Sequence, residues 1–181
     1  MARAFVAVRP PDDVLDAVEG LVGSELSSIA GARWTTREQR HLTLQFLGNH
    51  ADIDAVGAAL EALAVRAGTV ALGGVGAFPS ARRARVLWVG VAAGGAFLAQ
   101  LAAAAGALLA PLGHESEARE YHPHLTLARF KAPADLRDVV EAQAERSVGA
   151  SFAVEEVVLY ESNVRSTGAQ YTERAVVRLS D

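Results

Sequence analysis

The sequence contains no cysteine, a single lysine and few aromatic residues, which make up 6% of its 181 residues. Without cysteine, disulfide bonds, thiolate nucleophiles and cysteine-ligated zinc sites are excluded. Lys131 is the only lysine. Any phosphate contact from a basic side chain is therefore expected from arginine. The formal net charge of −4 argues against a broad basic surface for long nucleic acid, but it leaves room for a small nucleotide site.

Long apolar runs are also missing. The stretch FLAQLAAAAGALLA lies mid-chain and is shorter than the roughly 20 residues that cross a bilayer. The N-terminal MARAFVAVRPPDD has no long apolar segment before its prolines, so no signal peptide is expected. We therefore expect a cytoplasmic protein with no membrane segment. Hydrophobic residues make up 51% of the chain, which predicts one packed domain over residues 1–181.

Hydrophobic periodicity predicts alternating strands and helices. Strands show β-branched residues or strict alternation, and helices show apolar residues three and four positions apart. The expected strands are residues 3–8, 41–47, 69–78, 85–92, 124–130, 152–162 and 169–179, and the expected helices are residues 10–22, 52–66, 96–109 and 133–146.

The tetrapeptide His-Leu-Thr-Leu occurs twice, beginning at His41 and at His124. The two copies are 83 positions apart, the difference between 41 and 124. The same offset relates Phe5 to Trp88, both in apolar strands, and it relates further strand and helix starts. The sequence therefore predicts a duplicated β-α-β-α-β pattern with one additional C-terminal strand.

Each motif places its histidine and its threonine on one face of a strand, because residues two apart in a strand point the same way. The leucines between them belong on the opposite, core-facing side. A polar face repeated in this way indicates two lobes whose sheets face each other across a cleft. One imidazole can accept a proton while the other donates one. The two threonine hydroxyls can hydrogen-bond a phosphate, and a cyclic phosphodiester suits such a site.

The two motifs and their surroundings resemble the 2H phosphoesterase superfamily, which has two H-x-T-x motifs. More closely, the chain is similar to the bacterial RNA 2′,3′-cyclic phosphodiesterases, historically called 2′-5′ RNA ligases. The resemblance covers almost the whole chain through these segments: RWTTREQRHLTLQFLG, FPSARRARVLWVGV, HPHLTLARF and LYESNVRSTGAQYTE. It implies an α+β fold in which two antiparallel-rich sheets face each other across a central cleft with helices outside.

The resemblance also implies roles for the motif residues. His41 would be the proton donor, His124 the proton acceptor, and Arg129 a supporting phosphate contact beside Thr43 and Thr126. The implied reaction is hydrolysis of a 2′,3′-cyclic phosphate on RNA or a nucleotide, with tRNA-derived ends among the candidate substrates. We expect no cofactor and no metal, because no acidic cluster accompanies the histidines, and we expect a monomer. The alternative is a non-catalytic nucleotide-binding module of the same fold.

Other residues have competing interpretations. Phe78, Tyr121 and Tyr171 are the candidates for stacking on a base. Trp34, Phe46 and Trp88 are expected in the core, and His122 is expected at the rim. The basic segment 82–85, with arginines at 82, 83 and 85, is typical of a solvated hairpin turn, or alternatively of an RNA backbone contact.

Overall fold

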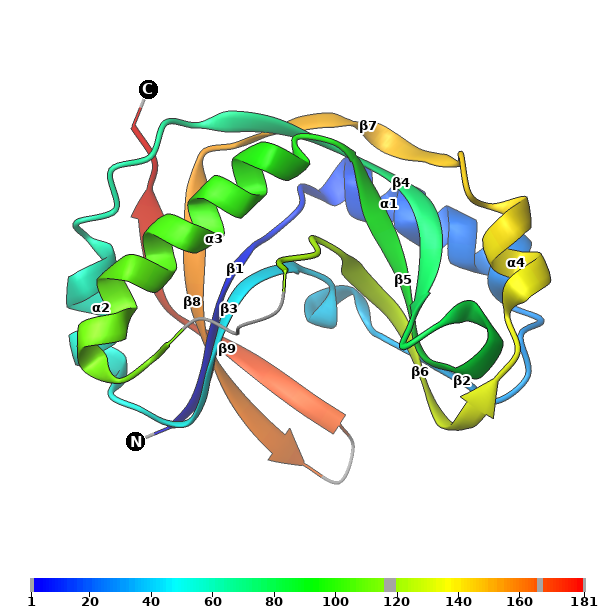
Figure 1. Ribbon diagram of the computed structural model, residues 1–181, viewed down its shortest axis with the longest axis horizontal. Coiled ribbons are helices and arrows are strands. Elements are labelled where there is room, and N and C mark those ends of the chain that lie inside the picture. The colour runs from blue at the N-terminus through cyan, green and yellow to red at the C-terminus, as the bar shows by residue number, and fades with distance from the viewer. Residues whose placement is uncertain (1, 116–119, 166–167, 181) are drawn as a thin grey trace.

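The computed structural model describes residues 2–115, 120–165 and 168–180. Nine strands form one antiparallel sheet, which is strongly curled and has helices packed on its outside (Figure 1). The main path of the sheet runs β7-β4-β5-β6-β3-β1-β8-β9, and β2 pairs with β6. The α+β class and the two-lobed arrangement of strands are confirmed. The two expected sheets are continuous, because they join where β3 meets β6.

The strands extend over ten or so residues in most cases, and β2 is the short exception. Their bounds are β1 (Ala2–Val8), β2 (Ala32–Trp34), β3 (Leu42–Ala51), β4 (Gly68–Phe78), β5 (Ala84–Ala93), β6 (Leu125–Ala134), β7 (Ser147–Val154), β8 (Glu156–Arg165) and β9 (Gly168–Arg178).

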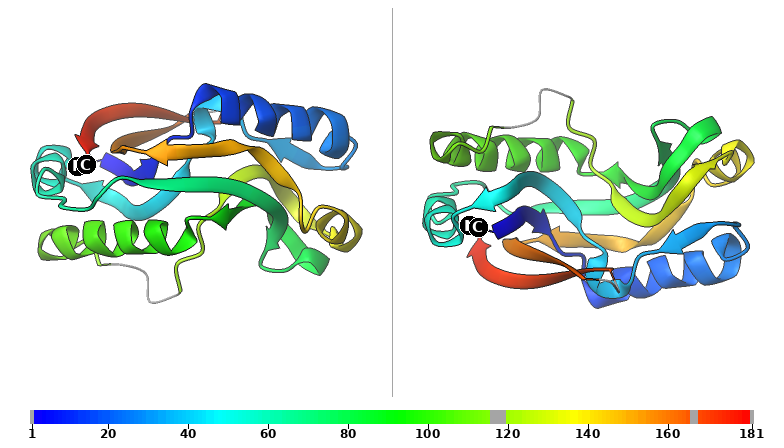
Figure 2. Two further views of the ribbon diagram at one scale, coloured as in Figure 1. Left: turned by 90° about the horizontal axis from the view of Figure 1, so that it is seen from above. Right: turned by 90° about the horizontal axis from the view of Figure 1, so that it is seen from below.

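The helices are α1 (Asp12–Leu21), α2 (Ile53–Leu60), α3 (Gly95–Leu109) and α4 (Arg137–Ala142). Two short helical turns follow helices, η1 (Val22–Leu26) after α1 and η4 (Ala110–Leu112) after α3, and two lie between strands, η2 (Arg37–Gln39) and η3 (Ala81–Arg83). Helix α1 packs on β7, and α3 packs on β3 and α2. Seen from above and below, α1 and α3 lie on opposite sides of the molecule with strands between them (Figure 2).

The duplication is present in the structure, but the two repeats exchange strands. The offset of 83 relates β3 (42–51) to β6 (125–134) and places β1 on β5. Strand β4 belongs to the first repeat, yet it pairs with β5 of the second, and β8 of the second repeat pairs with β1. Each half of the sheet therefore contains a strand from the other repeat, so neither half could form from its own repeat alone.

Both motif strands contain the same irregularity in pairing. Val6 pairs with Gln45 and Ala7 with Thr43, which leaves Leu44 as an extra residue. In the second repeat, Leu87 pairs with Ala128 and Trp88 with Thr126, which leaves Leu127 as the extra residue. A bulge of this kind reverses which face the following residues occupy.

Several predicted elements end or begin elsewhere. Helix α2 stops at Leu60 instead of reaching residue 66, because Leu63 and Val65 are buried in an irregular segment that leads into β4. The helix expected at residues 133–146 is only Arg137–Ala142, since β6 extends to Ala134. No expected element corresponds to strand β2, which is too short for a periodic signal.

Helix α3 together with η4, Gly95–Leu112, is long and apolar enough by composition to cross a membrane. In the fold about a third of this span is buried. Leu98, Leu101, Ala105 and Leu109 form its buried face and pack against the sheet and α2.

Candidate active site

The two motifs lie side by side at the junction of the two halves of the sheet. Leu42 of β3 pairs with Leu125 of β6, the one ladder pair between these strands in the described structure. Both leucines are fully buried, as the alternation predicts. Extended by one residue on each side, the antiparallel register of this single pair would set His41 across from Thr126 and Thr43 across from His124. Each histidine and threonine flanks a buried leucine and therefore lies on the other face of its strand.

His41 lies in an aromatic environment built by the N- and C-terminal strands. Its ring stacks on Phe5 with 4.5 Å between centroids and 24° between planes. Tyr171 meets it edge-on at 5.4 Å, and Tyr160 lies 6.2 Å away. Phe5 and Tyr160 form a small buried cluster of their own, on the face of β1 that points away from the main core.

His124 has a corresponding environment in the second repeat. Phe78 meets its ring edge-on at 4.9 Å, and Trp88, which the offset relates to Phe5, lies 6.1 Å away. Trp88 lies flat over Gly76, where a Cβ atom would come within 2.1 Å of the indole ring. Glycine at this position therefore allows the indole to occupy the space beside His124.

The backbone two residues before each imidazole lies close to it. The Nδ1 atom of His124 lies 2.7 Å from the carbonyl oxygen of His122. The backbone of Gln39, which the 83-residue offset relates to His122, acts on His41 in the direction that raises its pKa. When Nδ1 donates to a carbonyl, Nε2 is the nitrogen left to exchange protons with a substrate.

Both histidines favour the neutral form. Burial, with smaller contributions from the charges of His124 and Arg129, lowers the pKa of His41 to about 4. Burial also lowers the pKa of His124, again with contributions from neighbouring His122 and Arg129. The hydrogen bonds to the backbone oppose these effects only in part. An anion bound between the rings would favour the protonated forms and raise both pKa values.

The hydroxyls of Thr43 and Thr126 are half-buried, and neither has a hydrogen-bonding partner in the described part of the chain. Arg129 is exposed and belongs to no ion pair of the described residues. Strict alternation would have placed Arg129 on the core face with Leu125 and Leu127. The bulge at Leu127 returns it to the side of His124, within electrostatic reach of both histidines.

The corresponding bulge in β3 accounts for an incorrect prediction about Phe46. The alternation predicts that Phe46, which the offset relates to Arg129, lies in the core with Leu42 and Leu44. It is 56% exposed, because the bulge at Leu44 turns it out, and its ring lies 6.1 Å from Phe5. Phe46 thus joins the aromatic side chains near His41. A duplicated bulge leaves no signal in single-sequence alternation.

The three predicted stacking residues all lie near the motifs, but they differ in whether their side chains are already held by other contacts. Phe78 and Tyr171 contact His124 and His41 edge-on. Tyr121 is half-buried and donates its hydroxyl proton to the carbonyl of Thr43 at 2.9 Å, so it braces the first motif. Trp88, expected in the core, is half-buried beside His122 and His124, while Trp34 packs against the core as expected.

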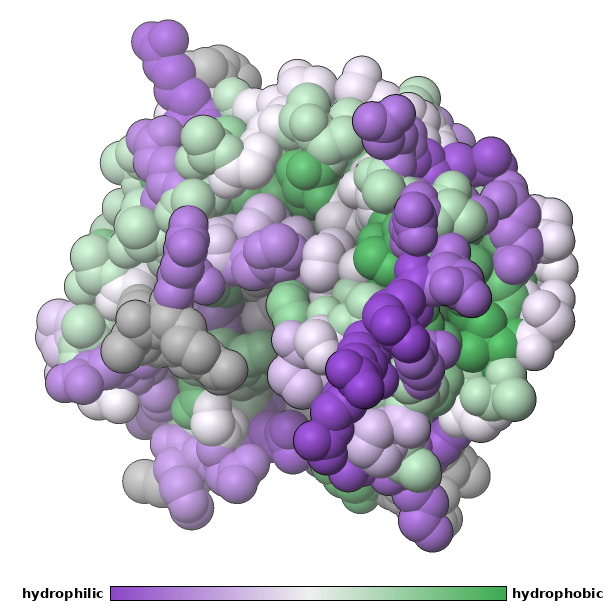
Figure 3. All heavy atoms as spheres, turned by 45° about the vertical axis from the view of Figure 1, so that its right-hand side comes forward, coloured by the Kyte–Doolittle hydropathy of each residue, from purple (hydrophilic) through white to green (hydrophobic). Residues whose placement is uncertain are grey.

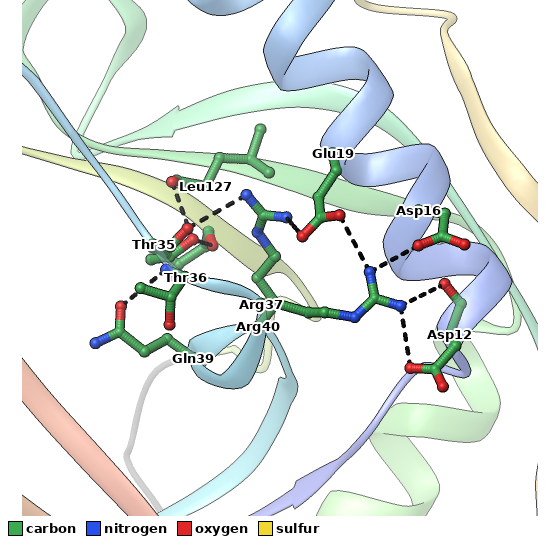
Figure 4. Close-up of polar contacts among 10 residues, drawn as sticks. Asp12, Asp16, Glu19, Thr35, Thr36, Arg37, Gln39, Arg40 and Leu127 are labelled. Carbon is green, nitrogen blue, oxygen red and sulfur yellow. Dashed lines mark hydrogen bonds and ion pairs between the residues drawn. The ribbon is translucent and has the colours of Figure 1, made fainter.

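The segment before the first motif binds the strand that carries the second. Strand β2 pairs with β6, and the backbone N–H of Thr35 donates to the carbonyl of Leu127 at 2.9 Å. The Thr35 hydroxyl lies 2.9 Å from the Thr126 carbonyl and 3.0 Å from that of Leu127 (Figure 4). We call residues 32–40 the strap. The strap links the two motifs at the place where β3 and β6 share one ladder pair in the described structure.

Arginines anchor the strap to helix α1. Arg40, next to His41, is buried, donates to the Thr35 carbonyl at 3.2 Å and lies 3.5 Å from a Glu19 oxygen. Arg37 contacts three acids of α1: Asp12, Asp16 and Glu19 (Figure 4). At the other end of the strap, the Gln39 amide donates to the Ala169 carbonyl in β9 at 2.8 Å. Sequence reasoning missed this network, because its partners are distant in the chain.

The described residues offer no candidate metal centre. Among them, no three His, Asp or Glu side chains converge. Metal-independent chemistry therefore stays a prediction that requires a direct test.

Comparison with known proteins identifies the family. The 2′-5′ RNA ligase superfamily matches residues 7–165. The chain belongs to this superfamily. A relative from Methanothermobacter thermautotrophicus, named RNA 2′,3′-cyclic phosphodiesterase, is 30% identical over 188 residues, covering 98% of each chain. One of the same name from Archaeoglobus fulgidus is 29% identical over 177 residues, covering 96% of this chain and 98% of its own.

A third relative of this superfamily, from Aeropyrum pernix, has the same name and is 36% identical over 110 residues. That match spans only 60% of this chain and 62% of the relative. Several of these relatives are archaeal, so placement in the narrower bacterial group stays a prediction.

Solved structures of other proteins share the fold. A protein of Thermus thermophilus is 28% identical with a TM-score of 0.78, and 97% of each chain is covered. Escherichia coli LigT in complex with NADP+ is 26% identical with a TM-score of 0.79, and 99% of each chain is covered. These comparisons confirm the 2H phosphoesterase fold that the sequence predicted.

Proposed function

We propose that the protein hydrolyses the 2′,3′-cyclic phosphodiester at the end of an RNA or nucleotide to the 2′-phosphomonoester. The observation that supports this proposal is the pairing of Leu42 with Leu125, the residues that stand between the histidine and the threonine of each motif. The names of the relatives support the same activity. Cytoplasmic residence, tRNA-derived ends and a monomeric enzyme are further parts of the proposal.

In the proposed reaction, His124 takes a proton from water, and the water oxygen forms a bond to phosphorus. The bond from phosphorus to the 3′-oxygen breaks, and His41 protonates that oxygen. Thr43 and Thr126 donate hydrogen bonds to the non-bridging oxygens, and Arg129 balances their charge. If an RNA 5′-hydroxyl took the place of water, the same forward steps would form a 2′,5′ linkage: the 5′-oxygen bonds to phosphorus, the bond to the 3′-oxygen breaks, and His41 protonates that oxygen.

The exposed ring of Phe46 and the edge-on rings of Phe78 and Tyr171 line the approach to the histidines. Aromatic rings in this setting can stack on an unpaired base. We include Phe46 with the residues that contact the base of the terminal nucleotide.

The test is incubation with nucleoside 2′,3′-cyclic phosphates, followed by chromatographic separation of 2′- and 3′-monophosphates. The 2′-product should form, and His41→Ala and His124→Ala should each lower the rate by about 10²- to 10⁴-fold. Crystal structures of E. coli LigT with ATP and with NADP+ show that this related protein binds nucleotides without a cyclic phosphate. Binding of cyclic nucleotides without turnover would therefore favour a nucleotide-binding module instead.

A further inference from the structure

The cationic side chains differ in whether they pair with carboxylates. Six are paired: Arg9, Arg37, Arg40, Arg137, Arg146 and Arg174. A second group, which we call the basic track, belongs to no ion pair of the described residues and consists of Arg33, Arg82, Arg83, Arg85, Arg129 and Lys131. Three more arginines, outside the track, also belong to no ion pair of the described residues: Arg3 on β1, Arg66 before β4 and Arg178 on β9.

The fold brings the basic track together from four separate segments. Arg33 of β2 pairs directly with Arg129 of β6. The Arg85 guanidinium, on β5, donates to the Lys131 carbonyl at 2.5 Å. The turn η3, which carries the other two arginines, contacts β6, and the Ala81 carbonyl accepts from the backbone N–H that follows β6 at residue 136.

Two like charges opposite each other on neighbouring strands destabilise a sheet. Arg33 and Arg129 are such a pair, and no carboxylate of the described residues forms an ion pair with either. Asp135 is close enough to Arg82 for that charge to lower its pKa, but hydrogen bonds from Arg137 are the main cause of the lowering. The track thus keeps its positive charge, in a chain whose formal net charge is −4.

The track begins at the site and runs away from it. Arg129 is close enough to both motif histidines to contribute to their low pKa values. From Arg129 the cations continue along β6 to Lys131 and across to η3. Figure 3 brings this side of the molecule forward and shows strongly hydrophilic side chains gathered in a strip across it. A row of cations leading out of a phosphodiester site fits a polymer of phosphodiesters.

We propose that the basic track binds the sugar–phosphate backbone of the RNA strand that precedes the cyclic phosphate. This inference rests on the proposed function and adds to it the path by which the RNA strand leaves the site. Phosphate contacts from arginine and lysine hold a strand in position without reading its sequence. They also make binding sensitive to salt, because bound counterions are released.

The test compares two substrates in one assay. One is a nucleoside 2′,3′-cyclic phosphate, and the other is an oligoribonucleotide of about ten nucleotides with the same terminal group. The triple variant Arg33→Gln, Arg83→Gln, Lys131→Gln removes three charges but leaves Arg129 in place. The ratio of kcat/KM for the oligonucleotide to that for the mononucleotide should fall at least tenfold. In a plot of log kcat/KM for the oligonucleotide against log salt concentration, the slope should become shallower by the amount expected for the loss of about three phosphate contacts.

Two matched variants complete the design. Arg174→Gln removes an arginine that is paired with Glu161 on the other half of the sheet, and it should leave the ratio unchanged. Replacing Arg33 and Arg83 with lysine keeps the charge and should retain most of the preference. An unchanged ratio in the triple variant, or an equal fall with both substrates, would overturn the proposal.

A binding measurement tests this inference independently of the proposed function. Fluorescence anisotropy with a labelled oligoribonucleotide carrying a 2′-phosphate needs no turnover. If the wild type binds this RNA and the triple variant binds at least tenfold more weakly, the track is supported even if no hydrolysis is detected. If cyclic nucleotides are hydrolysed but RNA binding is equal in the two proteins, the track is wrong and the proposed function stands.

Discussion

The hydroxyl of Thr35 lies 2.9 Å from the backbone carbonyl of Thr126, the threonine of the second motif. Thr35 also precedes His41 of the first motif by six positions. This hydrogen bond therefore joins the two halves of the proposed active site directly. It acts at the seam of the sheet, where Leu42 and Leu125 form the ladder pair. Thr35 does not reach the reacting atoms, so we regard it as a positioning residue.

Thr35→Val should lower kcat about tenfold or more with little change in KM, because small displacements of reacting groups slow the chemical step. The loss of one hydrogen bond should cost only about 1 kcal/mol of stability, measured by urea unfolding. Thr35→Ser, which keeps the hydroxyl, should restore kcat. Thr36→Val is the control, because Thr36 caps η2 without contacting the second motif. Equal losses in Thr35→Val and Thr36→Val would mean that Thr35 has only a local structural role.

The pH dependence of kcat/KM should show a maximum below pH 6.5. The productive free enzyme carries one proton on its two histidines. Both pKa values are lowered below 6.5, that of His41 to about 4, so this form is most populated between them and becomes rarer as pH rises. The measurement is kcat/KM with a cyclic nucleotide from pH 4 to 9. A maximum above pH 7 would contradict this assignment.

Acid should destabilise the fold through His41. Its folded-state pKa, about 4, is below the unfolded value near 6.5, so the neutral form is favoured in the native state. The resulting stabilisation is present above pH 6.5 and is lost as pH falls toward 4, by up to about 3 kcal/mol. His41→Gln should lose less stability over this interval in urea unfolding than the wild type. His50→Gln, at an exposed position, should behave as the wild type does.

The two histidines should respond differently to the leaving group. If His41 is the acid, a substrate with an activated leaving group no longer needs its proton, so such a substrate should rescue His41→Ala more than His124→Ala. The double variant should lose less than the product of the single losses, because the two residues act as a unit. Equal rescue of both single variants would refute the assignment of roles. Rates with activated and ordinary esters provide the comparison.

Removal of divalent metal should leave activity unchanged. The reason is chemical: two imidazoles and two hydroxyls suffice for the proposed proton transfers and for binding the phosphate oxygens. Dialysis against a chelator, followed by assay with and without added Mg²⁺ or Mn²⁺, tests this. Loss of activity that a divalent ion restores would show that the proposed mechanism is wrong.

The sequence alone determined the repeated His-Leu-Thr-Leu strands, the common face of each histidine and threonine, and the approximate symmetry. These features depend on local periodicity and on a fixed offset, both of which a single chain displays. The fold class followed from the same pattern, and the resemblance extended it to a family that the comparisons confirm. The roles of His41 and His124 come from that resemblance and are not tested by the geometry.

Only the tertiary structure shows which segments, distant in the sequence, lie next to each other. Strand exchange between the repeats, the strap through Thr35, and the gathering of Arg33, Arg85 and Arg129 all depend on partners far apart in the chain. The bulges at Leu44 and Leu127 decided that Phe46 and Arg129 face outward, because one extra residue in a strand reverses every side chain after it. Alternation in the sequence cannot reveal such a residue, since the bulge exists only relative to the neighbouring strand.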